Sequence, residues 1–577
     1  MQNLPAFTSM RDLRFGGDPK QEAWLQHFLM ENNLDHSRSP GLVASVEQLS
    51  FMVALEPGQI YVPCSDNLFI QLYAGELSLE LQKAYTKAWD FVNSFVARYS
   101  ADSNAAQRIL ALCRYRYDLY MSSRMILPSR MVKRLVSIVL SASLDPDPYR
   151  SIKTKYNAMA STALQDQKLQ QLLLDKPQES VADTLPNLRW EMDFAELARL
   201  FYLSTRAELW NGSVPPECWL YGIDESATEF ACLNSLFGPE DRPRKRILYI
   251  PNSAGAFMVD LAIVKSLLRQ GHQVVLALKD GFCFDTPTFW DIETDPVLKA
   301  ATKDMFMVEE SQISKNDLLR LLRAHRLLII NDGTMEELNL YRASVTFARA
   351  WKESDLIISK GTYNAQIFLG SSHEFTRDLL CVWQDENGSF RMDYKPKAHW
   401  VRKYSESDIN AKADAIIRNV RDTKRQGKSI MFYSAIIGSI PGQTKVAIEL
   451  VNRFVSHLRD KLNNTFIINP SEHFEEGMDG DDLMFMWERV QRSGYLDVWR
   501  FQTVDDIEAS FALLNKKTPA EWLGKDATFS TGCTKEMRIA LDVQSKRPEL
   551  QIIGPAPENF FRRREYGVGK YFDARIK

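Results

Sequence analysis

The sequence has no apolar run of the roughly 18 to 20 residues that a membrane-spanning helix needs. Its first residues, MQNLPAFTSMRDLRFGG, lack the basic and apolar regions of a signal peptide. The seven cysteines are scattered and never form a C-x-x-C pair, which favours free thiols in a reducing compartment over disulfides or structural zinc. A net charge of −3 gives no basic excess for nucleic acid. We therefore expect a cytoplasmic protein with neither a membrane nor a nucleic-acid partner.

A chain of 577 residues is longer than one hydrophobic core usually supports. Its composition, 45% hydrophobic and 25% charged, is ordinary for a folded protein. We expect four parts, with the charged stretch at 385–427 as the clearest boundary. These parts are an N-terminal accessory segment at 1–77, a helical region at 78–240, an α/β core at 241–400 and a C-terminal α/β domain at 425–577.

The last two parts alternate short apolar runs with amphipathic segments. RILYI, FMVDLAIVKSLLRQ and GHQVVLALK form a strand–helix–strand unit, and a similar series begins with SIMFYSAIIGS. This alternation predicts an α/β fold with a parallel, doubly wound sheet, preceded by a helical region and followed by a second Rossmann-like domain. The segment EELNLYRASVTFARAWKES is predicted to be one helix.

Polar residues gather where three of the predicted strands end. They occupy 252–255 after RILYI, 285–291 after VVLALK and 359–362 after DLII. Ligands of open parallel sheets bind at these carboxyl ends, so the residues indicate a binding site. The alternative is simple turn chemistry, because Asn, Ser, Gly and Asp are also the commonest turn residues.

Four ordered motifs, spread over about 220 residues, resemble those of the damage-control phosphatases, a family also called acidic-residue-methyltransferase-like. Each motif is short, and their order along the chain is what makes the resemblance specific. The matching residues are Asp147, Pro148, Tyr149, Lys153, Asn157 and Ala160 for the first motif, Ala254, Gly255 and Asp260 for the second, Lys279 and Thr288 for the third, and Lys360, Gly361 and Asn364 for the fourth.

The resemblance implies a divalent metal (Mg, Mn, Co or Ni) that orients a phosphate and activates water. It places Asn252, Ser253 and Asp285 at or near the metal positions, where the family has Asp, Asn and Asp. Two of these positions have therefore lost a carboxylate or an amide, and charge tunes the affinity of such sites. Asp291 is an alternative ligand in the same segment.

The other site residues follow from the same strand ends. Lys360 is predicted to stabilise charge on a phosphoryl group, with Asp285 as its catalytic partner. Gly361 and Asn364 are predicted to contact substrate. Asp332 and Thr334 end another strand and are either substrate-binding or structural, since Thr334 precedes two glutamates in a pattern typical of helix capping.

Three functions are open on this evidence. The first is a metal-dependent phosphatase that acts on a small phosphorylated metabolite. The second is a catalytically degenerate module that binds such a ligand or serves as a scaffold. The third is a transferase whose C-terminal domain supplies a second substrate. A homo-oligomer is compatible with all three.

Weaker signals lie in the C-terminal domain. The glycine-containing turn at 438–445 is either an ordinary turn or an anion cradle, and the acidic loop at 472–482 is expected to be solvated and to cap a helix. Cys533 opens a helix, where a lowered thiol pKa is expected. The basic tail at 562–570 either clamps an anion or is a plain terminal segment.

Overall fold

The computed structural model describes residues 7–34, 46–75, 77–99, 103–142, 145–175, 182–206, 209–210, 214–215, 218–225, 227–238, 244–440, 442–473, 475 and 477–565. The chain divides into two compact units, Met1–His399 and Trp400–Lys577. The fold is mixed α/β, with a mostly parallel seven-stranded sheet, a second parallel sheet and an N-terminal helical region. This confirms the fold class that the sequence predicts. No helix in the described ranges has the length and apolarity needed to cross a membrane.

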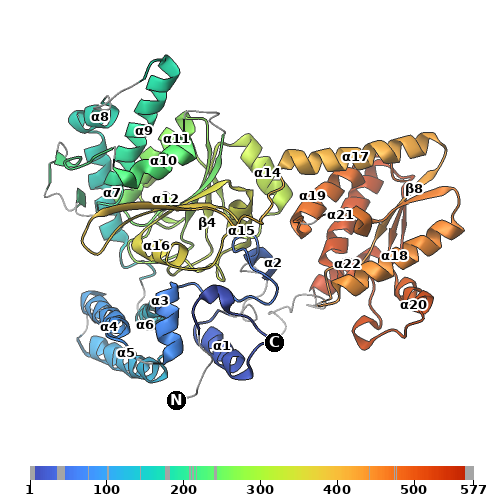
Figure 1. Ribbon diagram of the computed structural model, residues 1–577, viewed down its shortest axis with the longest axis horizontal. Helices are drawn as coiled ribbons and strands as arrows, with labels where there is room; N and C mark the ends of the chain where they lie inside the picture. The colour runs from blue at the N-terminus through green and yellow to red at the C-terminus, as the bar shows by residue number, and fades with distance from the viewer. Residues whose placement is uncertain are drawn as a thin grey trace. The chain divides into compact units, whose positions relative to one another are not determined.

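The first unit begins with helices that precede the sheet (Figure 1). In α6, buried Met131, Leu135 and Val139 recur every four residues and place one apolar stripe on the neighbouring helices α4 and α5. The helices of this region are α1 (Pro19–Glu31), α2 (Val46–Leu49), α3 (Asp66–Ala74), α4 (Leu79–Tyr99), α5 (Ser103–Ser123) and α6 (Pro128–Ala142).

The large sheet has the strand order β3-β4-β2-β1-β5-β6-β7, and only β7 runs antiparallel. Ile247 of β1 pairs with Val274 of β2 on one side and with Leu356 of β5 on the other. The central strands are buried on both faces, as expected for a covered parallel sheet. The strands are β1 (Arg246–Ile250), β2 (Gln273–Leu278), β3 (Phe306–Val308), β4 (Leu327–Asn331), β5 (Leu356–Lys360), β6 (Asp378–Gln384) and β7 (Phe390–Lys395).

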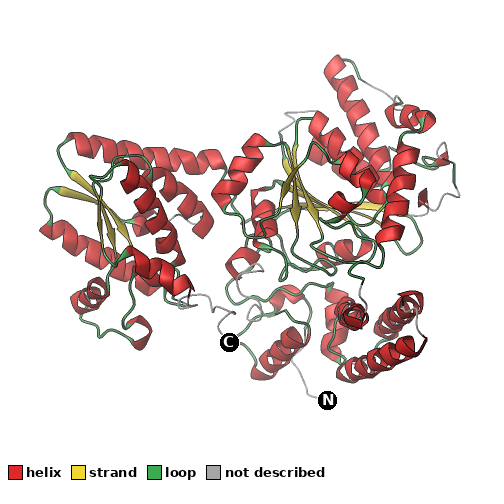
Figure 2. Cartoon of the chain, turned by 180° about the vertical axis from the view of Figure 1, so that it is seen from behind, coloured by secondary structure: helices red, strands yellow, loops and turns green. Residues whose placement is uncertain are grey.

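Helices cover both faces of this sheet (Figure 2). One layer is built on α11, which packs against α7 and α9, and the other contains α14 and α15. The helices of the two layers and their edges are α7 (Arg150–Leu164), α8 (Gln167–Leu174), α9 (Leu185–Leu203), α10 (Ala231–Phe237), α11 (Ala256–Arg269), α12 (Asp291–Thr294), α13 (Pro296–Ala301), α14 (Lys315–Ala324), α15 (Val345–Glu353) and α16 (Thr362–Phe368).

The predicted helix over 336–354 is wrong in its first half. Helix α15 begins only at Val345, because Ser344 is its N-cap and accepts a hydrogen bond from the backbone N–H of Phe347. Residues 335–344 instead form turns after β4. This leaves Glu336 and Glu337 on a loop at the carboxyl edge of the sheet.

The second unit is a four-stranded parallel sheet in the order β11-β10-β8-β9. Helices α17 and α19 pack together, as do α18 and α20. Its elements are α17 (Glu406–Arg425), β8 (Ser429–Ser434), α18 (Thr444–Lys461), β9 (Thr465–Ile468), α19 (Gly480–Gln491), β10 (Val498–Phe501), α20 (Val504–Leu513), α21 (Thr531–Lys546), β11 (Gln551–Ile553) and α22 (Pro557–Glu565).

Candidate functional site

The candidate site lies where the strand order of the large sheet reverses, at the carboxyl ends of β1 and β5. After β1 the chain places β2, β3 and β4 on one side of it and then returns to place β5 on the opposite side. Open α/β sheets bind ligands in the crevice at such a switch point. Asn252, after β1, and Gly361, after β5, meet here: a Cβ atom at Gly361 would lie 2.5 Å from Oδ1 of Asn252. Only glycine allows this approach, and its φ of +99° also suits glycine.

The loop after β2 is joined directly to the loop after β1. The backbone N–H of Ala254 donates to the carbonyl oxygen of Asp285 over 2.8 Å. Asp285 is half-buried, and burial raises the pKa of its carboxyl group. Phe284, just before it, has a left-handed backbone (φ +53°), a conformation that is uncommon outside glycine. The predicted metal-side residues Asn252, Ser253 and Asp285 therefore lie on two loops that contact each other.

Side chains of helix α7 bind both loops. Lys153 is buried and its Nζ lies 2.6 Å from carboxylate oxygens of both Asp147 and Asp291. Asn157 accepts a hydrogen bond from the N–H of Gly255 and donates one to Asp295. The first motif thus performs a supporting role, and Asp291, considered as an alternative metal ligand, is engaged by Lys153 and by the N–H of Thr288.

Lys360 lies inside the protein rather than at the crevice surface. Its Nζ donates to Oδ1 of Asp260 over 2.7 Å and to the Ser204 carbonyl over 2.6 Å. The Tyr249 hydroxyl donates to the same carboxylate oxygen. Burial lowers the pKa of Lys360 in spite of Asp260. The catalytic role of Lys360 stays a prediction, because its charge is already matched by a buried carboxylate.

The remaining predicted residues have internal partners as well. The Nδ2 group of Asn364 donates to the Lys360 carbonyl, one helical turn earlier. Asp332 accepts from the Nζ of Lys279 over 2.8 Å and from the hydroxyl of Thr334. This buried cluster joins the ends of β2 and β4. Substrate binding by these residues stays a prediction, and the contacts described are structural.

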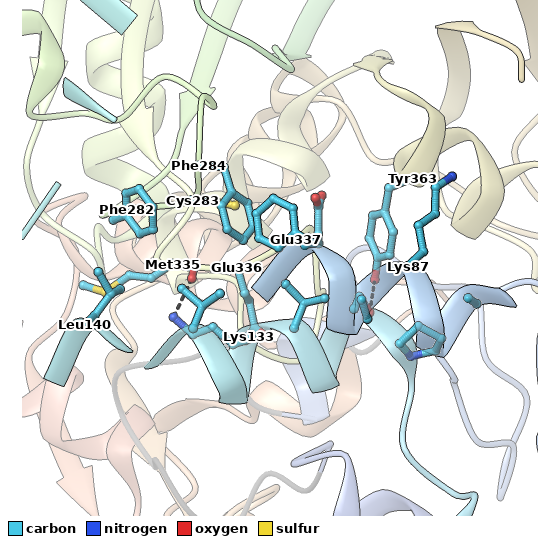
Figure 3. Close-up of a pocket in the computed structure, with 17 residues that line it drawn as sticks. Lys87, Lys133, Leu140, Phe282, Cys283, Phe284, Met335, Glu336, Glu337 and Tyr363 are labelled. Carbon is cyan, nitrogen blue, oxygen red and sulfur yellow. Dashed lines mark hydrogen bonds between the residues drawn. The ribbon is translucent and has the colours of Figure 1, made fainter. Parts of the chain in front are cut away.

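A cavity of about 460 Å³ opens beside these loops, within the size range of small-molecule sites (Figure 3). Helices α4 and α6 form one wall, and the loops after β2 and β4, together with Tyr363 of α16, form the other. Its aromatic lining includes Phe91, Phe282 and Phe284. Two half-buried carboxylates, Glu336 and Glu337, also line it, and burial raises the pKa of Glu337.

Sequence reasoning missed this cavity for two reasons. Its helical wall lies about 140 to 280 residues before the residues that it faces, so no local pattern connects them. In addition, the apolar periodicity predicts that Glu337 lies in a helix, whereas it lies on the loop before α15. An unusually aromatic turn, Phe282-Cys283-Phe284 directly before Asp285, was the available signal.

The predicted metal residues fit a hard divalent cation in donor type. Carboxylate, amide and hydroxyl oxygens are its preferred ligands. The half-buried Asp285 carboxylate is disfavoured in its charged form, which a cation would reverse. Across the described residues no group of three or more His, Cys, Asp and Glu side chains could hold a metal. A cation here would therefore depend on neutral donors, Asn252 and Ser253, beside one carboxylate.

The weaker C-terminal signals have mixed outcomes. Asp479 caps α19 by accepting from the N–H groups of Asp481 and Asp482, as expected for the acidic loop. The lowered thiol pKa expected for Cys533 is wrong, because burial raises it. The turn at 438–445 leads into α18, and its anion-binding role stays a prediction. The basic tail lies outside the described residues, apart from the backbone of α22.

Residues 218–383 match the damage-control phosphatase ARMT1-like domain. Among solved structures, a DUF89 family protein from Pyrococcus horikoshii is similar, with 15% identity, a TM-score of 0.32 and coverage of 52% of this chain and 90% of that one. A comparison with curated proteins gave no match.

Residues 218–383 therefore form a damage-control phosphatase ARMT1-like domain, which confirms for this segment the resemblance that the motifs show. The domain supports a phosphatase-like role on metabolites. It includes all the predicted site residues after β1, β2, β4 and β5, whereas the supporting motif on α7 lies before it.

Proposed function

We propose that the first unit binds a small phosphorylated metabolite at the switch point of its seven-stranded sheet and hydrolyses the phosphate ester with the help of a divalent cation. The observation that carries the proposal is the meeting of Asn252 with Gly361 at this switch point, beside the loop that holds Asp285. The ARMT1-like domain spans these residues.

Asp285, Asn252 and Ser253 are the residues that would hold the cation. A bound divalent cation would neutralise phosphoryl oxygens and activate a water nucleophile. The protein's own contribution is to fix the loops: Asn157 binds the N–H of Gly255, and Lys153 holds Asp291 at the start of α12. Such preorganisation keeps the reacting groups aligned.

A second function, ligand binding without hydrolysis, is favoured by one observation. The Lys360 ammonium is bonded to Asp260 and to the Ser204 carbonyl, so it does not offer a free charge to a phosphoryl group. The metal-side residues also contain one carboxylate, Asp285. A site of this kind would bind a phosphorylated metabolite and release it unchanged.

Phosphate release from a panel of sugar and nucleotide phosphates, with added Mg, Mn, Co or Ni, tests the proposal. We expect metal-dependent release that Asp285→Asn lowers at least about 100-fold, because the variant removes the only carboxylate among the proposed ligands. Asp280→Asn is the matched control, since Asp280 lies five residues earlier in the loop after β2. It should change the rate less than about threefold.

Metal content gives a readout that is separate from turnover. We expect the wild-type protein to bind Co²⁺ in equilibrium dialysis and Asp285→Asn to bind it at least about 10-fold more weakly. Turnover that Asp285→Asn leaves intact would contradict the hydrolytic proposal. Calorimetric binding of a phosphorylated metabolite with no release under any metal condition would instead establish the second function.

A further inference from the structure

The cavity beside the switch point has a character that phosphate binding does not explain. Aromatic rings line it from two directions: Phe91 on helix α4, Phe282 and Phe284 on the loop after β2, and Tyr363 on α16. The rings of Phe91 and Phe284 pack edge to face, with centroids 4.8 Å apart. An aromatic wall of this kind suits an apolar body or an organic cation.

Among the acidic residues near the cavity, Glu337 differs in its partners. Figure 3 shows its carboxyl group between Phe284 and Tyr363. Neighbouring acids are matched, since Glu336 pairs with Arg130 and Asp332 pairs with Lys279. Among the residues that the structure describes, no hydrogen bond or ion pair is formed by the Glu337 side chain. Burial and the neighbouring carboxylates Asp285 and Glu336 disfavour the charged form of Glu337, and a bound cation would relieve this.

The lysines that line the cavity do not fill this role. The Nζ of Lys133 donates to the Met335 carbonyl over 2.6 Å, and Figure 3 shows it directed there. Lys87 is exposed. Lys279 lies near enough to attract Glu337, but its ammonium donates to Asp332 and Thr334. The cavity therefore combines aromatic faces with a carboxylate that, among the described residues, has no hydrogen-bonded partner.

We propose that this cavity binds an organic ammonium group, held by the Glu337 carboxylate and the surrounding aromatic rings. The cavity and the switch point share their loops, because Phe284 immediately precedes Asp285 and Tyr363 follows Gly361 by two residues. For the phosphate end of the ligand, this inference rests on the proposed function. With phosphate at the switch point and ammonium in the cavity, the substrate class is a phosphorylated amine.

The binding of two isosteric probes to the full chain isolates the charge. Phosphocholine carries a trimethylammonium group, and 3,3-dimethylbutyl phosphate has the same shape with a neutral carbon in place of the nitrogen. By isothermal titration calorimetry we expect phosphocholine to bind at least about 10-fold more tightly, since a desolvated cation–π contact and a charge pair act together.

Glu337→Gln tests the assignment, with Glu293→Gln as the matched control, because Glu293 is an exposed carboxylate on nearby α12. Glu337→Gln should reduce the affinity ratio of the two probes to within about twofold and leave binding of the neutral probe unchanged. Glu293→Gln should keep the wild-type ratio. Tyr363→Leu, a second variant, should weaken phosphocholine binding more than binding of the neutral probe.

The outcomes separate this inference from the proposed function. Ammonium-selective binding that depends on Glu337, without phosphate release, supports the inference and contradicts hydrolysis. Metal-dependent release of phosphate from sugar phosphates, with no preference for phosphocholine over its neutral isostere, keeps the proposed function and overturns the inference. Absence of phosphocholine binding, or an affinity ratio that Glu337→Gln leaves unchanged, also overturns it.

Discussion

At the residue scale, Lys153 is the charge on which the supporting layer of the site depends. Its ammonium lies between the carboxylates of Asp147 and Asp291 and is almost fully buried. Removing one partner of a buried ion pair leaves an uncompensated charge. The residue therefore supports the loop after β2 by charge balance and needs no contact with substrate.

Lys153→Met should lower the free energy of unfolding of the first unit by about 3 to 5 kcal/mol. Lys155→Met is the control, because Lys155 lies on the same helix and is exposed. Urea unfolding, monitored by hydrogen exchange of peptides from β1, measures the change in unfolding free energy for both variants. Equal effects of the two substitutions would contradict a buried charge-balancing role for Lys153.

Gly361 combines a left-handed backbone with a close neighbour, and the two effects can be separated. Gly388 also has a positive φ (+78°), but an added Cβ there would meet its nearest atom at 3.7 Å rather than 2.5 Å. Both Ala substitutions should cost about 1 to 2 kcal/mol for the backbone. Gly361→Ala should also displace Asn252 and lower Co²⁺ affinity, which equilibrium dialysis measures. Unchanged Co²⁺ affinity in Gly361→Ala would show that Asn252 is not a ligand.

At the scale of elements, the carboxyl end of β8 in the second unit is closed by its own side chains. The Oε1 of Gln502 accepts from the N–H of Ile436, and Glu536 on α21 accepts from Nε2 of Gln491 over 2.9 Å. Cys533 donates to the Ala435 carbonyl. The crevice that a second Rossmann-like domain would offer to a ligand is therefore packed with buried polar groups.

This packing predicts a pH dependence for the second unit. Burial raises the pKa of Glu536 from 4.5 to about 7, so the folded state binds this proton more tightly than the unfolded state. The contribution of Glu536 to the free energy of unfolding should be largest below pH 4.5. It should fall by up to about 3 kcal/mol as the pH rises towards 7. Glu536→Gln should remove that loss.

Urea midpoints of exchange protection in β8, measured at pH 5.5 and pH 8, test the expectation. The wild-type midpoint should be lower at pH 8, while that of Glu536→Gln should change less. Glu508→Gln, an exposed carboxylate on α20, should behave as the wild type. A wild-type midpoint that rises with pH would reverse the assigned sign.

The sequence was sufficient for the fold class and for most strands and helices, but not for the side-chain partners at the strand ends. Strand alternation and the family motifs placed Asn252, Asp285 and Gly361 at strand ends, and the reversal at β1 explains why two of them meet. The partner of Lys360 is Asp260, 100 residues earlier, and no local pattern indicates such a pairing. Glu337 was hidden by helical periodicity that the Ser344 cap overrides.

At the scale of the whole molecule, the two compact units should unfold as separate transitions. Substitutions far apart without shared partners have additive effects. Lys153→Met should therefore lower the urea midpoint of β1 peptides and leave that of β8 peptides unchanged. Glu536→Gln should change the midpoint of β8 peptides and leave that of β1 peptides unchanged. Hydrogen exchange across a urea series follows both units in one sample. A shift of β8 peptides in Lys153→Met would show that the units unfold cooperatively.

The composite wall of the cavity has a kinetic consequence. Helices α4 and α6 cover loops that follow β2, β4 and β5, so one small ligand would touch segments from widely separated parts of the chain. A ligand held this way acts as a non-covalent crosslink. The ligand would then leave only when helices α4 and α6 move away from the loops, so its residence time would depend on the rate of that opening. An occupied cavity would also slow proteolysis of α4 and α6.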